Sequence, residues 1–288
     1  MTALDEVRIG GGAGMRTLVR GTLSGMLQRW ALFAVLVALW ELAARSADSV
    51  FFPPPSAIGS TGVDLWLSGP AYRLFLGDAV FDQVLPSVGR VLGGWAIAGV
   101  LGVGLGLVLG RSTTGMACVG WLLNFLRAIP PPLLVPFFLV TLGLGSMQIG
   151  TIVFGALWPV LLNTVDGARS VDAVKADTAT VFRLSKAQWL LGVVLPVALP
   201  KVFAGLRVSL SLALILMVVS ELVGSLGGGI GVSLVRAQRD YDLPPMWAWI
   251  VLLGILGYLF NALLLVVERR VLTWQPGRGS VLAATGRA

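Results

Sequence analysis

The sequence has little charge and lacks the residues on which many catalytic and metal sites depend. Its 288 residues include 21 Lys and Arg, 14 Asp and Glu, one Cys and no His. Charged residues make up 12% of the chain, whereas soluble domains carry about 25%. Without His, a His-containing triad or zinc site is excluded, and the single Cys118 excludes an internal disulfide. The composition therefore excludes a soluble enzyme or a soluble binding module.

Apolar residues and glycine are abundant instead. Apolar residues make up 56% of the chain, and 37 residues are Gly. The mean hydropathy is +0.88. Glycine is commoner in transmembrane helices than in soluble ones. We therefore expect an all-α integral membrane protein.

Long uncharged runs predict about six transmembrane helices, since each span needs about 20 mostly apolar residues. The clearest run lies between Arg90 and Arg111. Residues 128–165 are also uncharged but too long for one helix, and Gly143-Leu144-Gly145-Ser146 predicts a turn that divides them. The first of these two spans is expected to begin near Gly115. The other spans are expected at residues 30–44, 208–226 and 245–267.

The distribution of Lys and Arg predicts the orientation. With the N-terminus in the cytoplasm, 15 of these residues are cytoplasmic and five, including Arg90, are outside, while Arg127 lies in the membrane. This bias follows the positive-inside rule and predicts cytoplasmic termini and a cytoplasmic loop at residues 166–200. We expect a flexible cytoplasmic N-terminus at 1–29, a transmembrane domain at 30–274 and a cytoplasmic tail at 275–288. The N-terminal apolar run lacks a good cleavage site and is interpreted as a retained helix.

Charged residues stand inside two expected spans. A charge at the bilayer centre costs about 2.5–3.5 kcal/mol on insertion scales. The three prolines that follow Arg127 break a helix, which survives only where protein or a water-filled cavity covers it. Two interpretations stay open: Arg127 and Glu221 form a structural pair, or both face a central pathway. The candidate pathway residues are Arg127, Pro130, Glu221, Asn124 and Gln148.

Small residues recur at every fourth position of the second span. They are Gly94, Ala98, Gly102, Gly106 and Gly110. Such a face lets another helix backbone approach closely. We favour packing within the subunit over a sliding surface in a moving transporter.

The cytoplasmic loop contains two helix signals. Ser185 and Gln188 form an S-x-x-Q capping box, which predicts a helix from near Lys186. An earlier helix is expected at residues 171–182, with Asp172 in its first turn. A short polar-faced helix between two spans either lies on the membrane surface or docks a soluble partner.

Several motifs, in order, resemble one family. Asp177-Thr178-Ala179, Arg183 and Val193-Val194-Leu195-Pro196 resemble the E-A-A-x3-G-x9-I-x-L-P signature of ABC importer permeases, with Arg in place of the motif's Gly. Further matches are S-V-G-R-V-L-G-G at 87–94, L-R-A-I-P-P at 126–131 and E-R-R-V-L-T-W at 268–274. The chain thus resembles the nitrate/sulfonate/taurine branch of type I importers over residues 30–274.

The resemblance implies a MetI-like permease fold in a bacterial plasma membrane and a non-catalytic transport subunit. It also implies a coupling helix that contacts an ATPase subunit. The implied coupling residues are Val171, Val174, Asp177, Thr178, Ala179, Val181, Phe182, Arg183, Leu195 and Pro196.

The resemblance implies several partners as well. The chain has no Gly-Lys dipeptide and so no P-loop, and ATP and Mg²⁺ are expected on a separate ATPase dimer, with no cofactor on this chain. The other implied partners are a second permease copy, most simply in a homodimer, an extracytoplasmic solute-binding protein and membrane lipid, with no nucleic acid. The implied substrate is a small anion or organic solute of the nitrate, sulfonate or taurine type.

Two other functions are alternatives to this one. A secondary transporter driven by an ion gradient also uses broken helices and intramembrane charges. Many such carriers have two similar halves, but the elements around Arg127 and Glu221 do not match each other. A membrane enzyme is disfavoured because the sequence has no nucleophile motif and no metal-ligand cluster.

Overall fold

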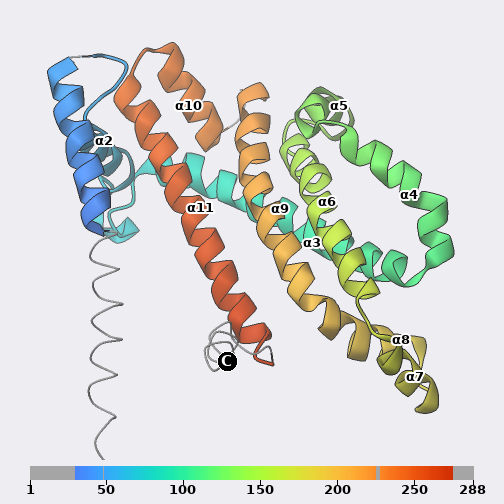
Figure 1. Cartoon of the computed structure of the whole chain (residues 1–288). Helices are drawn as coiled ribbons and strands as arrows, with labels where there is room; N and C mark the ends of the chain where they lie inside the picture. The colour runs from blue at the N-terminus through green and yellow to red at the C-terminus, as the bar shows by residue number, and fades with distance from the viewer. Residues whose placement is uncertain (1–29, 48, 225–227, 275–288) are drawn as a thin grey trace, which may run out of the picture.

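The computed structural model describes residues 30–47, 49–224 and 228–274 (Figure 1). Every regular element within these ranges is helical. The expectations for residues 1–29 and 275–288 lie outside the described residues. After a first helix, Trp30–Ala47, the elements follow in this order: α2 (Pro55–Trp66), η1 (Ala71–Arg73), η2 (Val80–Val84), α3 (Leu85–Arg111), α4 (Thr113–Ala128), η3 (Pro131–Leu134), α5 (Val135–Leu142), α6 (Met147–Arg169), α7 (Ala173–Val181), α8 (Lys186–Trp189), η4 (Leu190–Val194), α9 (Leu195–Val223), α10 (Ile230–Arg239) and α11 (Leu243–Val271).

The number of apolar helices agrees with the expectation of about six spans. Among the described residues, five helices are long and apolar enough to cross a membrane. A sixth span results if α4 and the η3–α5 segment, which are bent by 85°, are counted together. The break lies at the predicted prolines, because Pro130 is extended and η3 begins at Pro131. The predicted turn at 143–146 is also present and ends where α6 begins.

The fifth span differs from the sequence prediction. Residues 186–223 form one continuous helical segment, in which α8 passes through the π-helical turn η4 into α9. We predicted instead a helix near Lys186 and a separate span from residue 208. The prediction began the span at the uncharged run after Arg207, and the charges of Lys186, Lys201 and Arg207 kept the earlier residues out of it. Here Pro196 stands in the first turn of α9, just after the π-turn, and Pro200 is accommodated within the helix.

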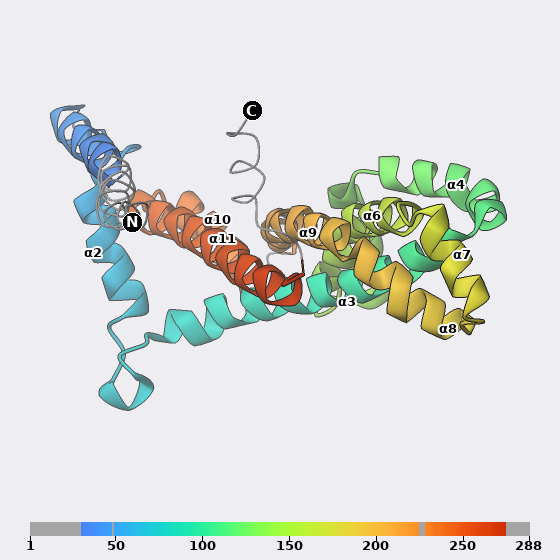
Figure 2. The ribbon, with the colours of Figure 1, turned by 60° about the horizontal axis from the view of Figure 1, so that its bottom comes forward.

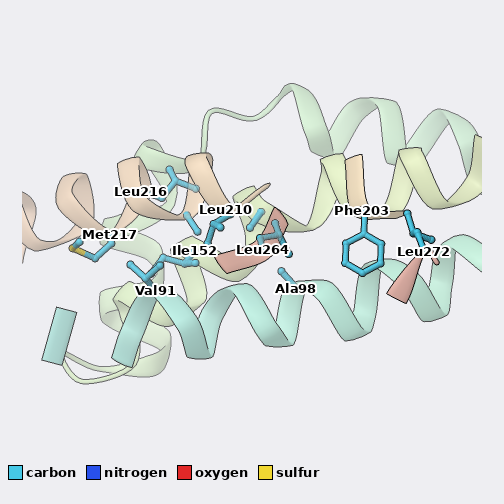
Figure 3. Close-up of a cluster of buried hydrophobic side chains, with 11 residues drawn as sticks. Val91, Ala98, Ile152, Phe203, Leu210, Leu216, Met217, Leu264 and Leu272 are labelled. Carbon is cyan, nitrogen blue, oxygen red and sulfur yellow. The ribbon is translucent and has the colours of Figure 1, made fainter. Parts of the chain in front are cut away.

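The three helices α3, α6 and α9 form the core of the molecule. Their contacts bury side chains such as Val91, Ile152 and Leu210 (Figure 3). Figure 2 shows the first helix and α2 near one end of α3, with α4, α7 and α8 near the other. The core helices therefore lie between these two groups of outer helices and connect them.

The small residues of α3 pack against α6. An ideal Cβ added to Gly94 would lie 2.7 Å from Ile152 Cγ2, and one added to Gly106 would lie 2.5 Å from Thr164 Cβ. Ala98, Gly102 and Gly110 are buried in the same row. The favoured interpretation, packing within the subunit, agrees with this contact between α3 and α6.

The outer helices carry apolar side chains on exposed faces. Tyr258 and Leu263 of α11 are exposed, as are Trp30 and Leu42 of the first helix. Both helices are apolar enough to span a membrane while little of their surface is buried in the chain. An exposed apolar surface of this extent is expected where helices face lipid.

Candidate functional site

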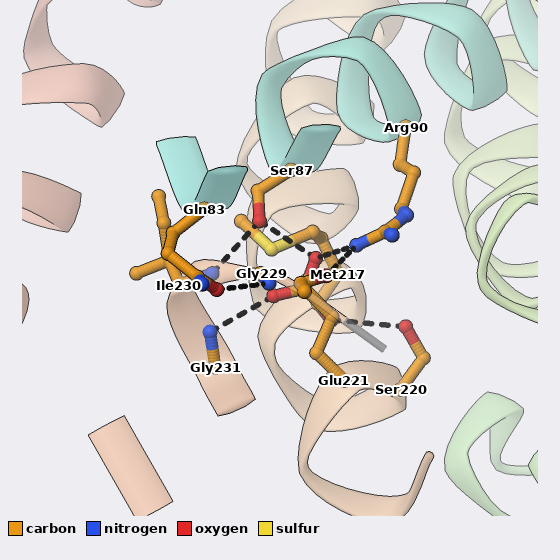
Figure 4. Close-up of polar contacts among 10 residues, drawn as sticks. Gln83, Ser87, Arg90, Met217, Ser220, Glu221, Gly229, Ile230 and Gly231 are labelled. Atoms are coloured by element: carbon orange, nitrogen blue, oxygen red, sulfur yellow. Dashed lines mark hydrogen bonds and ion pairs between the residues drawn. The ribbon is translucent and has the colours of Figure 1, made fainter. Parts of the chain in front are cut away.

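Glu221 lies in a closed polar cluster near the end of α9. Its side chain is 0% exposed, and its Oε1 accepts hydrogen bonds from Ser87 Oγ and Arg90 Nη1, both at 2.7 Å (Figure 4). The backbone N–H of Gly231 donates to Oε2 at 2.8 Å. A buried carboxylate needs such partners, since an unpaired charge is costly away from water. The structure thus pairs Glu221 with Arg90, on α3, and not with Arg127.

The same cluster fastens the start of α10 to α3. Arg90 Nη1 also donates to the carbonyl of Gly228 at 2.8 Å, and the Ile230 N–H donates to Ser87 Oγ at 2.9 Å. Gly229 has a φ of +157°, and a Cβ there would lie 2.4 Å from Cδ of Glu221. Only glycine fits at this position because of that close approach. The cluster therefore links α3, α9 and α10 around one carboxylate.

Sequence reasoning missed Arg90 and Ser87 as functional partners of Glu221. We assigned Arg90 to an outer segment, whereas it is part-buried within α3. The signal was present, because Ser87 and Arg90 are the two polar residues of the S-V-G-R motif at 87–90. They stand three positions apart, so that both reach the same face of a helix.

The remaining candidate pathway residues lie elsewhere. Arg127 is exposed at the end of α4, and Asn124 and Pro130 are exposed beside it. Among the described residues, Arg127 has no ion-pair or hydrogen-bond partner, since it occurs in none of the polar contacts found there. Gln148 is buried in the first turn of α6, where Oε1 lacks a hydrogen-bond partner in the described structure. The structure thus brings Arg127, Asn124 and Pro130 together and separates Glu221 from them.

Helix α7 lies within the predicted coupling loop and is shorter than expected. It spans Ala173–Val181, and Asp172 is its N-cap, not part of its first turn. The Lys175 side chain and backbone N–H donate hydrogen bonds to the Asp172 carboxylate, and these bonds hold the pKa of that carboxyl below its usual value. The predicted capping box of Ser185 and Gln188 is present and starts α8 at Lys186.

Three apolar side chains of the α7 region point away from the rest of the chain. Val174 is 74% exposed, Val181 78% and Phe182 73%. Ala179, on the same helix, is buried. One side of the helix therefore packs against the rest of the chain, and another side is apolar and exposed. We call this exposed surface the α7 tip (Val174, Val181 and Phe182).

The remaining coupling candidates surround this tip. Asp177 and Thr178 are exposed on α7, Val171 is half-buried before it, and Leu195 and Pro196 are half-buried at the start of α9. Arg183 follows the C-terminus of α7 with a φ of +49°. The N–H of Arg183 donates to Thr180 and that of Leu184 to Ala179, which closes the helix in a Schellman motif. A left-handed residue at this position is usually glycine, which explains the Gly of the motif that Arg183 replaces.

These features describe a helical membrane protein with an exposed loop helix at the end of a long helical segment, and the comparisons identify its family. The family "Binding-protein-dependent transport system inner membrane component" matches residues 100–273. The chain is 31% identical over 255 residues to the bicarbonate transport system permease protein CmpB of Synechococcus elongatus, covering 88% of this chain and 92% of the relative. It is 30% identical over 258 residues to the putative aliphatic sulfonates transport permease protein SsuC of Bacillus subtilis, covering 88% of each.

A solved structure has the same fold. The inward-facing MetNI methionine ABC transporter aligns with a TM-score of 0.57 and 21% identity, covering 66% of this chain and 94% of that one. The chain belongs to the binding-protein-dependent transport system inner membrane component family. It is the permease of an ABC importer, a multi-pass membrane protein with the predicted all-α, MetI-like fold.

Proposed function

We propose that this permease imports a small anion and is driven by a separate ATPase subunit that binds the α7 tip. The observation that supports the coupling role is the exposure of three large apolar side chains on one loop. Exposed apolar clusters rimmed by polar residues mark protein interaction sites. Asp177, Thr178 and Arg183 supply a polar rim that a partner can recognise.

A movement of α7 has a direct route into the membrane domain. The Schellman motif and the capping box join α7 to α8 with only Phe182–Ser185 between them. The helical segment then continues from Lys186 to Val223 and contains Glu221 near its far end. We infer that closure of the ATPase subunits displaces this segment as a unit, and that Leu195 and Pro196 lie where it enters the core.

The second copy is proposed to cover α4 and to complete the pathway. No residue of α4 is buried within the chain, although α4 belongs to an apolar bent pair. Arg127, Asn124 and Pro130 lie on this uncovered element. A charged residue within the membrane normally faces a bundle interior or a water-filled cavity. Two copies in a homodimer would supply such an interior, with Arg127 at the pathway.

The proposed substrate is a small anion. Bicarbonate and aliphatic sulfonates, in the names of the two relatives, are both anions. A guanidinium such as that of Arg127 hydrogen-bonds oxyanions in a planar, two-point geometry. We propose that an extracytoplasmic solute-binding protein delivers this anion, that ATP and Mg²⁺ bind the ATPase partner, and that both termini of this chain lie in the cytoplasm.

The experiment compares purified complexes of Val181→Asp and Phe182→Asp with a Leu74→Asp control. Leu74 is as exposed as the α7 tip but lies in the segment between α2 and α3, distant in sequence from α7. Both tip variants should lose the co-purifying ATPase chain, while the control keeps it, because a buried, unpaired carboxylate weakens an apolar contact. Retention of the ATPase by both tip variants would contradict the proposed coupling surface.

A further inference from the structure

A pocket of about 560 Å³ lies between the α7–α8 loop and the end of α3. Three cationic side chains line it: Arg111, Arg183 and Lys186. Its other walls are the indole of Trp189, the hydroxyl-bearing Thr180 and small or aliphatic residues of the loop. No carboxylate is among the lining residues. The pocket is thus both cationic and partly apolar.

The three cations are not neutralised by the chain itself. In the part of the chain that the structure describes, the ion pairs found involve none of Arg111, Arg183 and Lys186. The neighbouring carboxylate Asp172 is already bonded to Lys175. Cations of one sign around a concave surface raise the local concentration of anions. The positive charge of the pocket is therefore not balanced by a carboxylate among its lining residues, and the pocket should attract an anion.

The fold also fixes the backbone positions from which the three cations reach the pocket. The guanidinium of Arg111 lies 5.5 Å from the Trp189 ring centroid, in a cation–π arrangement. Lys186 is the first residue of α8, directly after the N-cap Ser185 and within the capping box. Arg183 has the left-handed backbone of the Schellman motif, which is unfavourable for a residue other than glycine. Strained backbone of this kind is a pointer to function when it places a side chain in a site.

We propose that this pocket binds a phosphate group that carries an apolar or organic body. Lysine and arginine side chains bind the phosphate oxygens, and Trp189 with the aliphatic wall contacts the body. The volume lies in the range of small-molecule sites and exceeds what a bare phosphate fills. The ligand is either the headgroup of an anionic phospholipid in the leaflet at the α7 end or a soluble organic phosphate. Arg183 also belongs to the polar rim of the proposed ATPase contact, whereas Arg111, Lys186 and Trp189 line only this pocket.

The test uses the purified full-length transporter with its associated subunits and measures bound ligand by native mass spectrometry. Phosphatidylglycerol is titrated against phosphatidylcholine, and phenyl phosphate, a soluble phosphate with an apolar body, is added in a second arm. The pocket variant is Arg183→Gln with Lys186→Gln. The matched control is Arg169→Gln with Lys201→Gln, two exposed cations near the same loop that do not line the pocket. Arg183→Gly is a further variant that removes a pocket cation and relieves the backbone strain, so it is expected to fold at least as well as the parent.

Loss of each pocket cation should weaken phosphatidylglycerol binding about fivefold, since one cation near an anionic headgroup contributes about 1 kcal/mol. Arg183→Gly should show the single-cation loss with an unchanged or raised melting temperature, and the control should bind as the parent does. Displacement of the lipid by phenyl phosphate identifies a soluble source, and retention of the lipid identifies the membrane. Equal binding by the parent, the pocket variant and Arg183→Gly, or no binding of either phosphate probe, would overturn the proposal.

Discussion

The core formed by α3, α6 and α9 differs from the arm formed by α4, η3 and α5 (residues 113–142) in how its charged residues and glycines are packed. In the core, Glu221 is fully buried and bonded to Ser87, Arg90 and Gly231. In the arm, Arg127 is exposed on a helix none of whose residues is buried. The sequence presents both as charges in apolar runs. Their partners distinguish the two charges: Glu221 is paired within the chain, whereas Arg127 has no ion-pair or hydrogen-bond partner among the described residues.

Glycine shows the same contrast. A Cβ on Gly106 of the core would lie 2.5 Å from a side-chain atom of Thr164, whereas one on Gly120 of the arm would lie 3.9 Å from Met116. The core glycines are therefore needed for close helix contact, and the arm glycine is not. Substitutions in the two regions should change the free energy of unfolding by different amounts. For glycine substitutions, the sign of that change should differ as well.

The largest effect is expected from Glu221→Gln. Removing the carboxylate leaves the part-buried Arg90 without its charge partner, which costs about 3–5 kcal/mol for a buried pair. The thermal unfolding midpoint of the purified protein measures the loss. Arg90→Gln is the matched partner, and the double variant should cost less than the sum of the single ones, because the two residues share one interaction. Strict additivity would contradict the assignment of this pair as a structural unit.

The next effect separates the two classes of glycine. Gly106→Ala should destabilise the protein by about 1–3 kcal/mol, as overpacking does in a well-filled core. Gly120→Ala is the matched substitution in the arm and should be neutral or stabilising by up to about 1 kcal/mol, since Ala has the higher helix propensity. Both are followed by thermal unfolding. Equal destabilisation by the two would show that α4 is packed as tightly as α3.

The smallest effect concerns an exposed carboxylate. The pKa of Asp172 is lowered by its bonds to Lys175, so its contribution to α7 is present at neutral pH and is lost as the pH falls through that lowered pKa. Asp172→Ala should therefore speed amide hydrogen exchange in the first turn of α7 at neutral pH and have little effect in acid. The global unfolding midpoint should hardly change. An unchanged exchange rate at neutral pH would contradict the capping role.

Much of the local structure could be predicted from the sequence because it depends on neighbours along the chain. The capping box at Ser185, the break at Pro130 and the small-residue face of α3 all follow from short-range rules, and each is present. The partner of Glu221 depends on how α3 and α9 pack, which no local pattern specifies. Arg90 was therefore counted with the outer loop charges, because charge counting cannot distinguish a loop arginine from a helical one that points inward.

Two further differences between prediction and structure arise because the spans were predicted from long uncharged runs. The uncharged run placed the start of the fifth span at residue 208, yet the helical segment continues from Lys186 through the π-turn η4 to Val223. The short helices α2 and α10 were not predicted, because they lie between spans and lack long apolar runs. The pathway role of Arg127 and the coupling role of α7 stay predictions, since they depend on chains outside this one.

The most direct test of the contrast between core and arm is thiol labelling of the assembled transporter. Single cysteines are introduced as Arg127→Cys and Ser220→Cys in a Cys118→Ser background, and a water-soluble maleimide is applied during transport in proteoliposomes. Ser220 is fully buried next to Glu221. The Arg127→Cys thiol should be modified and its modification should slow import, while the Ser220→Cys thiol should stay unmodified. Protection of position 127 under turnover, with unchanged import, would contradict the claim that the arm charge faces the pathway.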